Sequence, residues 1–348
     1  MGRIVASTGF VFTVMLASAV AQTPGASGDQ QYLLIDADTT RLGVPRPANL
    51  SSVREQLINA GKMGYGVHVM AGLSTSMTVL LKRDGAGPRN YRLITQSKDG
   101  AFLDELNTAG AEGFRVVADT IKEYQRGRFD TQWAAILAQQ PNGRRFKYSV
   151  TKGVEEGARA LEASGAVPRL LVGILGREGQ IKSDTLLFFE EIEGTTAPSV
   201  IEARDYRIVM TARTSTMEKD IREAATEGYR IIGAGFGRMT VVMARDRNVA
   251  SPPPIEYRVI ATIRVKTSAE ELQAAGTEGF RISAMTQEQS EGIFVIHRTP
   301  GTSEKFEFQV LRLEHETANA VLLDAESAGY RIAGLFSDLV VLERPVTR

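Results

Sequence analysis

The sequence predicts an α+β fold made of six tandem β-α-β-β repeats, in which antiparallel sheets have helices packed on one face. A glycine recurs with alanine four residues before it and an aromatic residue after it, and the third copy departs most from this pattern. A β-type run precedes each glycine and two more follow it. The glycines stand at 64, 113, 165, 228, 279 and 329, which gives spacings of 49, 52, 63, 51 and 50 residues.

The first element of each repeat is a strand that opens on an aromatic residue. In four copies this residue comes 21 or 22 residues before the glycine, and the β-type run follows it at once. The first copy carries an insertion with Pro45 and Pro47 between this strand and the rest of the repeat. The six aromatic residues are Tyr32, Tyr91, Tyr148, Tyr206, Tyr257 and Phe308.

The second element is a helix that ends at the glycine. A large apolar residue seven positions before the glycine and a small one four positions before it lie on one helix face, which therefore packs on a sheet. The pairs Ser52/Glu55, Ser215/Glu218 and Thr267/Glu270 match the capping box and predict where three helices begin. The glycine suits the left-handed position just after a helix.

The last two elements are strand-like runs after the glycine. The final run is similar between copies, as in residues 77–84 of the first copy and 239–246 of the fourth. The Gly233–Gly237 run precedes a strand and not a helix, so it predicts a hairpin turn better than a phosphate-binding loop. Pro252–Pro254 reads as a stiff linker between two copies.

The repeats resemble a small bacterial β-α-β-β domain family of unknown function. The likeness rests on Tyr91-Arg-Leu-Ile, Leu106-Asn107, Glu112-Gly113-Phe114 and Lys82-Arg83, and similar residues recur through nearly all of the chain. Tyr or Phe stands in five copies where the family usually has Trp. The resemblance implies a strand–helix–strand–strand module and no known catalytic residues.

The ends of the repeats follow from the pattern and from the breaks between copies. Residues 1–21 match a signal peptide with Ala19-Val20-Ala21 before the cleavage point, and 22–30 match a flexible leader. The mature protein is therefore expected in the periplasm or outside the cell, without membrane insertion. The expected repeats are 31–84, 90–140, 145–192, 205–246, 255–299 and 305–348, with a linker at 193–204.

Each repeat of about 50 residues is too small to fold alone, so the repeats must pack on one another. The longest connector, 193–204, favours two halves of three repeats each. Three pairs of repeats and a closed ring of six are the alternatives. The sequence does not choose among these layouts, and it leaves the oligomeric state open.

The amino-acid composition argues against nucleic acid as a partner and against metal or thiol chemistry. The 348 residues hold 41 Lys and Arg against 41 Asp and Glu, so no net charge attracts nucleic acid. The chain has no cysteine, and its three histidines, His68, His297 and His315, show no metal-ligand spacing. We therefore expect no metal, no cofactor and no catalytic residue. The acidic pairs Glu190-Glu191 and Glu270-Glu271 read as solvated charge.

Arginine is the one polar residue that recurs with the repeat. Arg115, Arg230, Arg281 and Arg331 open the strand after the glycine and are candidates for binding carboxylate or phosphate groups. Another row, Arg92, Arg207 and Arg258, stands second in the first strand. Pairing within the repeat with acids such as Glu112, Glu227 and Glu278 is the favoured interpretation of these arginines.

These features favour an exported binding or interaction scaffold that is not an enzyme. A periplasmic protein that binds a small molecule or an anion is one alternative. An enzyme with a site between repeats is the other. The expected partners are a protein or a small anionic ligand.

Overall fold

The computed structural model shows mixed α+β architecture in six units that have the same element order. It describes residues 30–36, 40–41, 44–45, 50–73, 76–96, 99–125, 131–163, 169–175, 185–194, 204–211, 213–235, 239–262, 264–288, 291–336 and 339–346. The proposed signal peptide, nearly all of the leader, most of the 193–204 linker and Gly165 lie outside these residues. By contacts, residues 31–348 form one compact part of the chain.

Each unit runs strand, helix, strand, strand, with one further short strand in unit 2. Unit 1 is β1 (Tyr32–Asp36), α1 (Leu50–Lys62), β4 (Tyr65–Leu73) and β5 (Ser76–Arg83). Unit 2 is β6 (Tyr91–Gln96), α2 (Asp99–Ala111), β7 (Phe114–Val116), β8 (Lys122–Gln125) and β9 (Thr131–Gln139). Unit 3 is β10 (Phe146–Lys152), α3 (Val154–Ala163), β11 (Arg169–Leu175) and β12 (Leu186–Ile192).

The second half of the chain repeats this order. Unit 4 is β13 (Arg204–Thr211), α4 (Thr214–Thr226), β14 (Arg230–Gly235) and β15 (Met239–Asp246). Unit 5 is β16 (Glu256–Thr262), α5 (Val265–Thr277), β17 (Arg281–Glu288) and β18 (Glu291–Arg298). Unit 6 is β19 (Phe306–Arg312), α6 (Ala318–Ser327), β20 (Arg331–Phe336) and β21 (Leu339–Pro345). The unit 1 insertion forms the small hairpin β2 (Thr40–Arg41) and β3 (Val44–Pro45).

Every unit forms one antiparallel sheet whose central strand comes last in the chain, as in the order β1-β5-β4. We call the first strand of a unit the outer strand and the strand after the helix the inner strand. Five inner strands carry a register shift after their first two or three paired residues, as between Ile231 and Gly233. In unit 2 the inner strand is divided into β7 and β8, which both pair with β9.

For every helix except α3, whose following glycine lies outside the described residues, the glycine after the helix has the left-handed backbone that the sequence predicts. Gly64, Gly113, Gly228, Gly279 and Gly329 have φ between 83° and 93°. A Cβ would be strained in this conformation, so glycine ends the helix and turns the chain into the inner strand.

The capping boxes at Ser215 and Thr267 are wrong. Helices α4 and α5 begin earlier, at Thr214 and Val265, and no side chain caps either helix. The boxed residues lie inside the first turn, where their local hydrogen bonds compete with those of the helix. Helix α1 likewise begins at Leu50, before Ser52.

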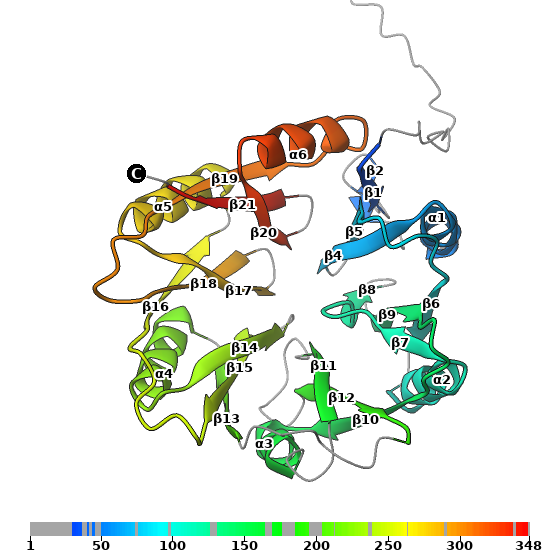
Figure 1. Cartoon of the computed structure of the whole chain (residues 1–348), viewed down its shortest axis with the longest axis horizontal. Coiled ribbons are helices and arrows are strands. Elements are labelled where there is room, and N and C mark those ends of the chain that lie inside the picture. The colour runs from blue at the N-terminus through cyan, green and yellow to red at the C-terminus, as the bar shows by residue number, and fades with distance from the viewer. Residues whose placement is uncertain are drawn as a thin grey trace, which may run out of the picture. The chain divides into compact units, whose positions relative to one another are not determined.

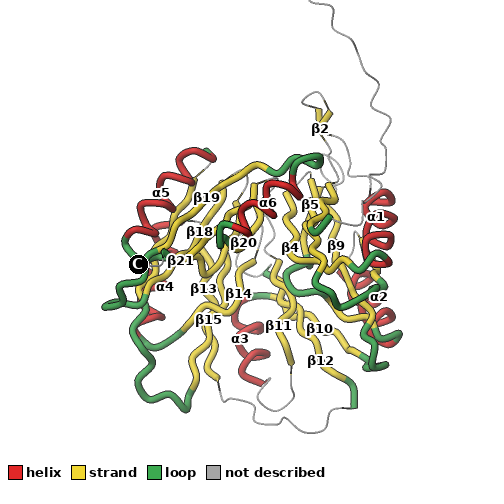
Figure 2. The backbone as a smooth tube through the Cα atoms, turned by 45° about the horizontal axis from the view of Figure 1, so that its top comes forward, coloured by secondary structure: helices red, strands yellow, loops and turns green. Residues whose placement is uncertain are grey.

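The units contact one another in a closed cycle within residues 31–348. Helices α1 to α5 each pack on the outer strand of the following unit, and α6 packs on β1. Inner strands contact one another in the same order, and β20 contacts β4. Figures 1 and 2 show the helices outside the strands, with the inner strands facing one another.

The hydrophobic core lies mainly between units, in six clusters. We name each contact region between neighbouring units a seam, from seam 1–2 to seam 6–1. One cluster lies at each seam, for example Leu57 with Tyr91 at seam 1–2 and Tyr32 with Leu322 at seam 6–1. The others are at seams 2–3, 3–4, 4–5 and 5–6. Because the seam 3–4 cluster crosses the expected break at 193–204, the preferred layout of two halves is wrong, and the closed-ring alternative matches these contacts.

Both faces of a sheet are buried, which corrects the expectation of helices on one face. In β18, Ile293 and Val295 join the core of seam 4–5 with α4, whereas Phe294 and Ile296 join that of seam 5–6 with α5. Alternate residues of a strand point to opposite faces. Each helix therefore lies between its own sheet and the next one.

Candidate functional site

Polar side chains from the helices bind the free backbone edge of the next outer strand. Asn107 of α2 accepts a hydrogen bond from the Tyr148 N–H (2.7 Å) and donates one to the Tyr148 carbonyl (3.1 Å). In α6, Asn319 Oδ1 accepts from the Tyr32 N–H (2.8 Å). These contacts satisfy edge groups that an unpaired strand would leave open.

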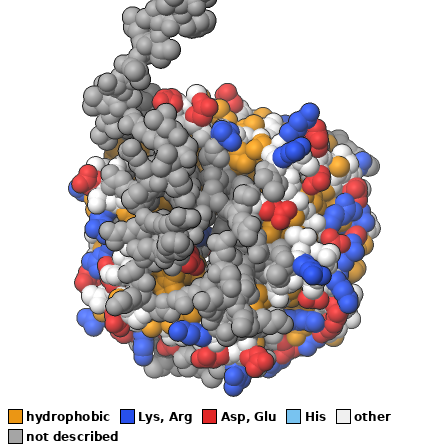
Figure 3. All heavy atoms as spheres, turned by 180° about the vertical axis from the view of Figure 1, so that it is seen from behind, with side chains coloured by type: hydrophobic (Ala, Val, Ile, Leu, Met, Phe, Trp, Pro, Cys, Tyr) orange, Lys and Arg blue, Asp and Glu red, His pale blue; other side chains and the backbone are white. Residues whose placement is uncertain are grey.

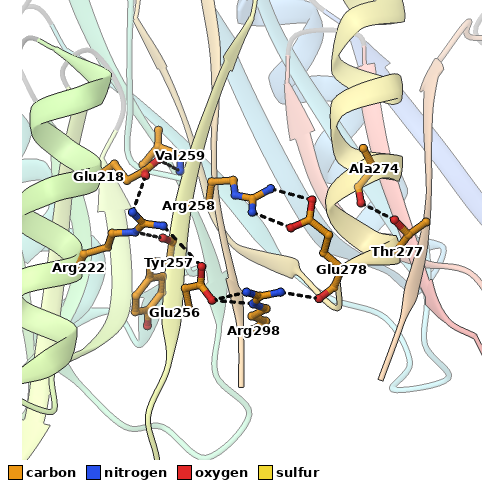
Figure 4. Close-up of polar contacts among 10 residues, drawn as sticks. All are labelled: Glu218, Arg222, Glu256, Tyr257, Arg258, Val259, Ala274, Thr277, Glu278 and Arg298. Carbon is orange, nitrogen blue, oxygen red and sulfur yellow. Dashed lines mark hydrogen bonds and ion pairs between the residues drawn. The ribbon is translucent and has the colours of Figure 1, made fainter. Parts of the chain in front are cut away.

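A surface groove of about 460 Å³ opens at seam 4–5, beside the edge of β16. Helix α4 closes part of this edge, because Glu218 accepts from the Val259 N–H (2.9 Å) and Arg222 donates to the Tyr257 carbonyl (2.8 Å). Figure 4 shows α4 and α5 on either side of β16 with these contacts. The groove is lined by Thr214, Arg258, Val259, Ile260, Ala261, Glu271 and Ala274.

The charge of Arg258 in this groove is compensated. Both terminal nitrogens bind Glu278, at 2.8 and 3.3 Å, and the guanidinium stacks 4.4 Å from the Phe280 ring centroid. The hydrogen bond from Arg258 lowers the pKa of Glu278. A guanidinium group held by both a carboxylate and an aromatic ring has little freedom to move. The groove therefore offers fixed polar walls, with the exposed Glu271 beside it.

The arginines of the outer strands pair within their own unit, as the favoured interpretation expects. Arg207 lies 3.0 Å from Glu227 and Arg258 lies 2.8 Å from Glu278. Arg92 pairs with Glu112 in the same way. All three pairs are partly solvent-exposed, so each contributes at most about 1 kcal/mol to stability.

The four candidate arginines at the start of the inner strands do not form one row. Each lies at a different seam. Arg115 and Arg281 pair with acids of the next unit, so the favoured interpretation of pairing within the repeat is wrong for them. Arg115 Nε is 2.8 Å from Glu190 of the next unit. Arg281 and Arg331 both pair with Glu343, the former at 3.4 Å. Arg230 donates to the Tyr229 carbonyl (2.8 Å) and to that of Pro253.

Two buried carboxylates, missed by the sequence analysis, organise these arginines. The Glu190 residue is fully buried and Glu343 is 2 % exposed, so the interpretation of Glu190 as solvated charge is wrong. Burial raises the pKa of Glu190, which its pair with Arg115 opposes. Both acids lie on the central strand of a sheet, and both faces of that strand are covered. The sequence does indicate the burial of Glu190 and Glu343, because each follows a run of apolar residues in the last strand of its unit.

The three histidines are not part of a metal-binding cluster among the described residues. His297 Nδ1 lies 2.5 Å from the Ser283 hydroxyl, and burial lowers the pKa of His297 and that of His68. Among the described residues no three His, Asp or Glu side chains are grouped as a metal site would require. Lys122 on β8 is also buried, and burial lowers its pKa to about 8.

On the face shown in Figure 3, the coloured basic and acidic side chains are interspersed. In the part of the chain that is described, no helix has both the length and the apolar character needed to cross a bilayer. No family model, curated protein or solved structure matches the chain.

Proposed function

We propose that the six units are tandem copies of one β-α-β-β repeat and that the protein is an exported binding or interaction scaffold without enzymatic activity. The shared strand order and the glycine after each described helix end but one support the repeat. The signal-like residues 1–21 support export to the periplasm or the cell exterior. The resemblance to the bacterial domain family stays part of this proposal.

The observation that carries the binding role is the groove at seam 4–5. Its volume suits one or two side chains of a protein partner, or a small ligand. Its walls come from two units and are held by Glu218, Arg222 and Glu278. Preorganised polar walls reduce the entropy lost on binding. Because the walls are balanced in charge, a protein segment with both polar and apolar side chains fits this groove best.

Site-specific photocrosslinking tests this role. A benzoylphenylalanine replaces Ala274, an exposed residue in the groove, and a control replaces the exposed Asn142 in the turn before β10. In periplasmic extract of the source cell, we expect a discrete crosslinked partner at position 274 and none at 142. The variant Glu271→Arg should remove that product. Equal labelling at both positions, or none at 274, contradicts the proposed groove.

Export is tested separately. Mass spectrometry of the protein secreted by its own cell should give an N-terminus at Gln22. A protein recovered from the cytoplasm with Met1 to Ala21 still attached contradicts it.

A further inference from the structure

One residue position on the central strand differs in charge from seam to seam. It lies directly opposite the aromatic residue that recurs in the outer strand of every repeat, Tyr32, Tyr91, Tyr148, Tyr206, Tyr257 or Phe308. Glu190 stands opposite Tyr148, Glu343 opposite Phe308, and His297 opposite Tyr257. At the other three seams Ala138, Ala244 and Lys82 take this position. We call it the acid position.

At two seams the residue at the acid position forms an ion pair with an arginine of the preceding unit. Glu190 binds Arg115 at seam 2–3 and also accepts from the Tyr148 hydroxyl, at 3.3 Å. At seam 5–6, Glu343 binds Arg281 and accepts from the Ile282 N–H, at 3.1 Å. The arginine is thereby neutralised where water is partly excluded, as a buried charge requires.

At two further seams the arginine and the acid are absent together. Gly66 and Ala138 take these places at seam 1–2, and Leu170 and Ala244 take them at seam 3–4. At seam 6–1 the residue at the acid position is Lys82. Lys82 and the arginine of this seam, Arg331, each pair with a carboxylate at another position. Arg331 binds Glu343 of its own unit, and Lys82 binds Glu326 at 2.6 Å.

Seam 4–5 is the exception, because Arg230 faces His297. No described carboxylate pairs with Arg230, whose contacts are the two carbonyls of Tyr229 and Pro253. Those contacts leave donors of the guanidinium unused. Burial lowers the pKa of Arg230. Burial also lowers the pKa of His297, where the charge of Glu343 opposes this effect and that of Arg230 adds to it. The seam therefore has a cation without the anion found at seams 2–3 and 5–6.

The remaining groups of this seam match those around Glu190. Tyr257 corresponds to Tyr148, and its hydroxyl accepts from the Ile231 N–H (3.2 Å) as that of Tyr148 accepts from the Val116 N–H (2.9 Å). The Tyr257 hydroxyl keeps its own proton to donate. Ser283 contacts Nδ1 of His297, and when Ser283 donates, the neutral ring carries its proton on Nε2.

We propose that seam 4–5 binds a small organic carboxylate at Arg230, next to His297, which stands where seams 2–3 and 5–6 have a glutamate. Arg230 supplies the charge, and the Tyr257 hydroxyl and the His297 ring supply neutral donors. A carboxylate fits better than a larger tetrahedral anion, because the same frame accepts a glutamate carboxylate elsewhere in this chain. This site is separate from the groove and does not depend on the scaffold role.

Propionate, which has the end group of a glutamate side chain, is the probe. Thermal unfolding of the full mature chain is followed in increasing sodium propionate, with sodium chloride at equal ionic strength as the reference. We expect propionate to raise Tm, because a ligand selective for the folded state stabilises it. The variant Arg230→Gln should weaken binding by about tenfold or more. Lys266→Gln, whose side chain is 89 % exposed, is the charge-matched control and should respond as the parent does.

The variant His297→Glu supplies the missing carboxylate from the chain itself. We expect a higher Tm than the parent without ligand, and no further rise with propionate. The proposal is overturned if propionate does not raise the Tm of the parent beyond the chloride reference, or if Arg230→Gln responds as strongly as the parent. A His297→Glu protein with the full response of the parent overturns it as well. Inorganic phosphate that gives the larger, Arg230-dependent shift overturns the choice of carboxylate.

Discussion

Gly100 and Gly110 lie in the same helix, α2, and should respond to alanine with opposite signs. At Gly100 a Cβ would meet no atom within 4 Å. Alanine there should stabilise the protein by about 0.5–1 kcal/mol, because glycine is the poorer helix former. At Gly110 a Cβ would lie 2.2 Å from the Phe146 carbonyl oxygen and 3.0 Å from the Tyr148 ring. Both contacts are with β10 of the next unit.

The size of the Gly110 effect follows from this overlap. The obstructing atom belongs to the backbone, so α2 must move away from β10. That movement also stretches the two hydrogen bonds between Asn107 and Tyr148. Because the overlap is with backbone, the overpacking cost falls in the upper part of its usual range, about 2–3 kcal/mol, and the gain in helix propensity offsets about 1 kcal/mol of it. We expect Gly110→Ala to lower the free energy of unfolding by about 1–2 kcal/mol.

Urea unfolding followed by tryptophan fluorescence measures both variants. Trp133 is the only tryptophan of the chain, and it packs edge-on against Phe102 and Phe188 in the core of seam 2–3. The midpoint should rise for Gly100→Ala and fall for Gly110→Ala. If Gly110→Ala is as stable as the parent, the close approach of α2 to the next sheet is refuted.

Two further results are expected at the seams. Glu190→Gln should lower the urea midpoint by more than Glu112→Gln, because the Glu190 side chain is fully buried and that of Glu112 is half exposed; equal effects would contradict this. The hydrogen bond from Lys82 lowers the pKa of Glu326, so this contact stabilises fully above the ordinary carboxyl pKa and is lost as pH falls through the lowered value. Hydrogen exchange at Tyr32 should then quicken, beyond its intrinsic pH dependence, between pH 6 and pH 3, whereas constant protection would count against the contact.

Local features of the fold follow from the sequence. The glycines at 64, 113, 228, 279 and 329 end their helices in the left-handed region, because that conformation depends on neighbouring residues alone. The pairing of Arg207 with Glu227 and of Arg258 with Glu278 follows in the same way, since both partners belong to one unit. The capping boxes failed because the threonines at strand ends, Thr211 and Thr262, bind the backbone just before the helices begin.

Features that depend on a neighbouring unit were out of reach. Gly110 and Gly276 each stand three residues before the glycine that ends their helix. The absence of a side chain there lets the next outer strand approach the helix, and nothing in a single repeat indicates that contact. The apolar run before Glu190 indicates its burial, but its pairing with Arg115 of unit 2 does not follow from a single repeat. Arg230 stands out among the four candidate arginines only when the acid position of each seam is compared.

The closed cycle of contacts is tested most directly at seam 6–1, where Lys82 Nζ lies 2.6 Å from Glu326, 244 residues away in sequence. A carbodiimide joins lysine and carboxylate groups in direct contact, and mass spectrometry of the monomer band identifies the products. We expect a Lys82–Glu326 link together with the local control link between Lys266 and Glu270, which lie 3.8 Å apart. Recovery of the control without the Lys82–Glu326 link would contradict the closed cycle.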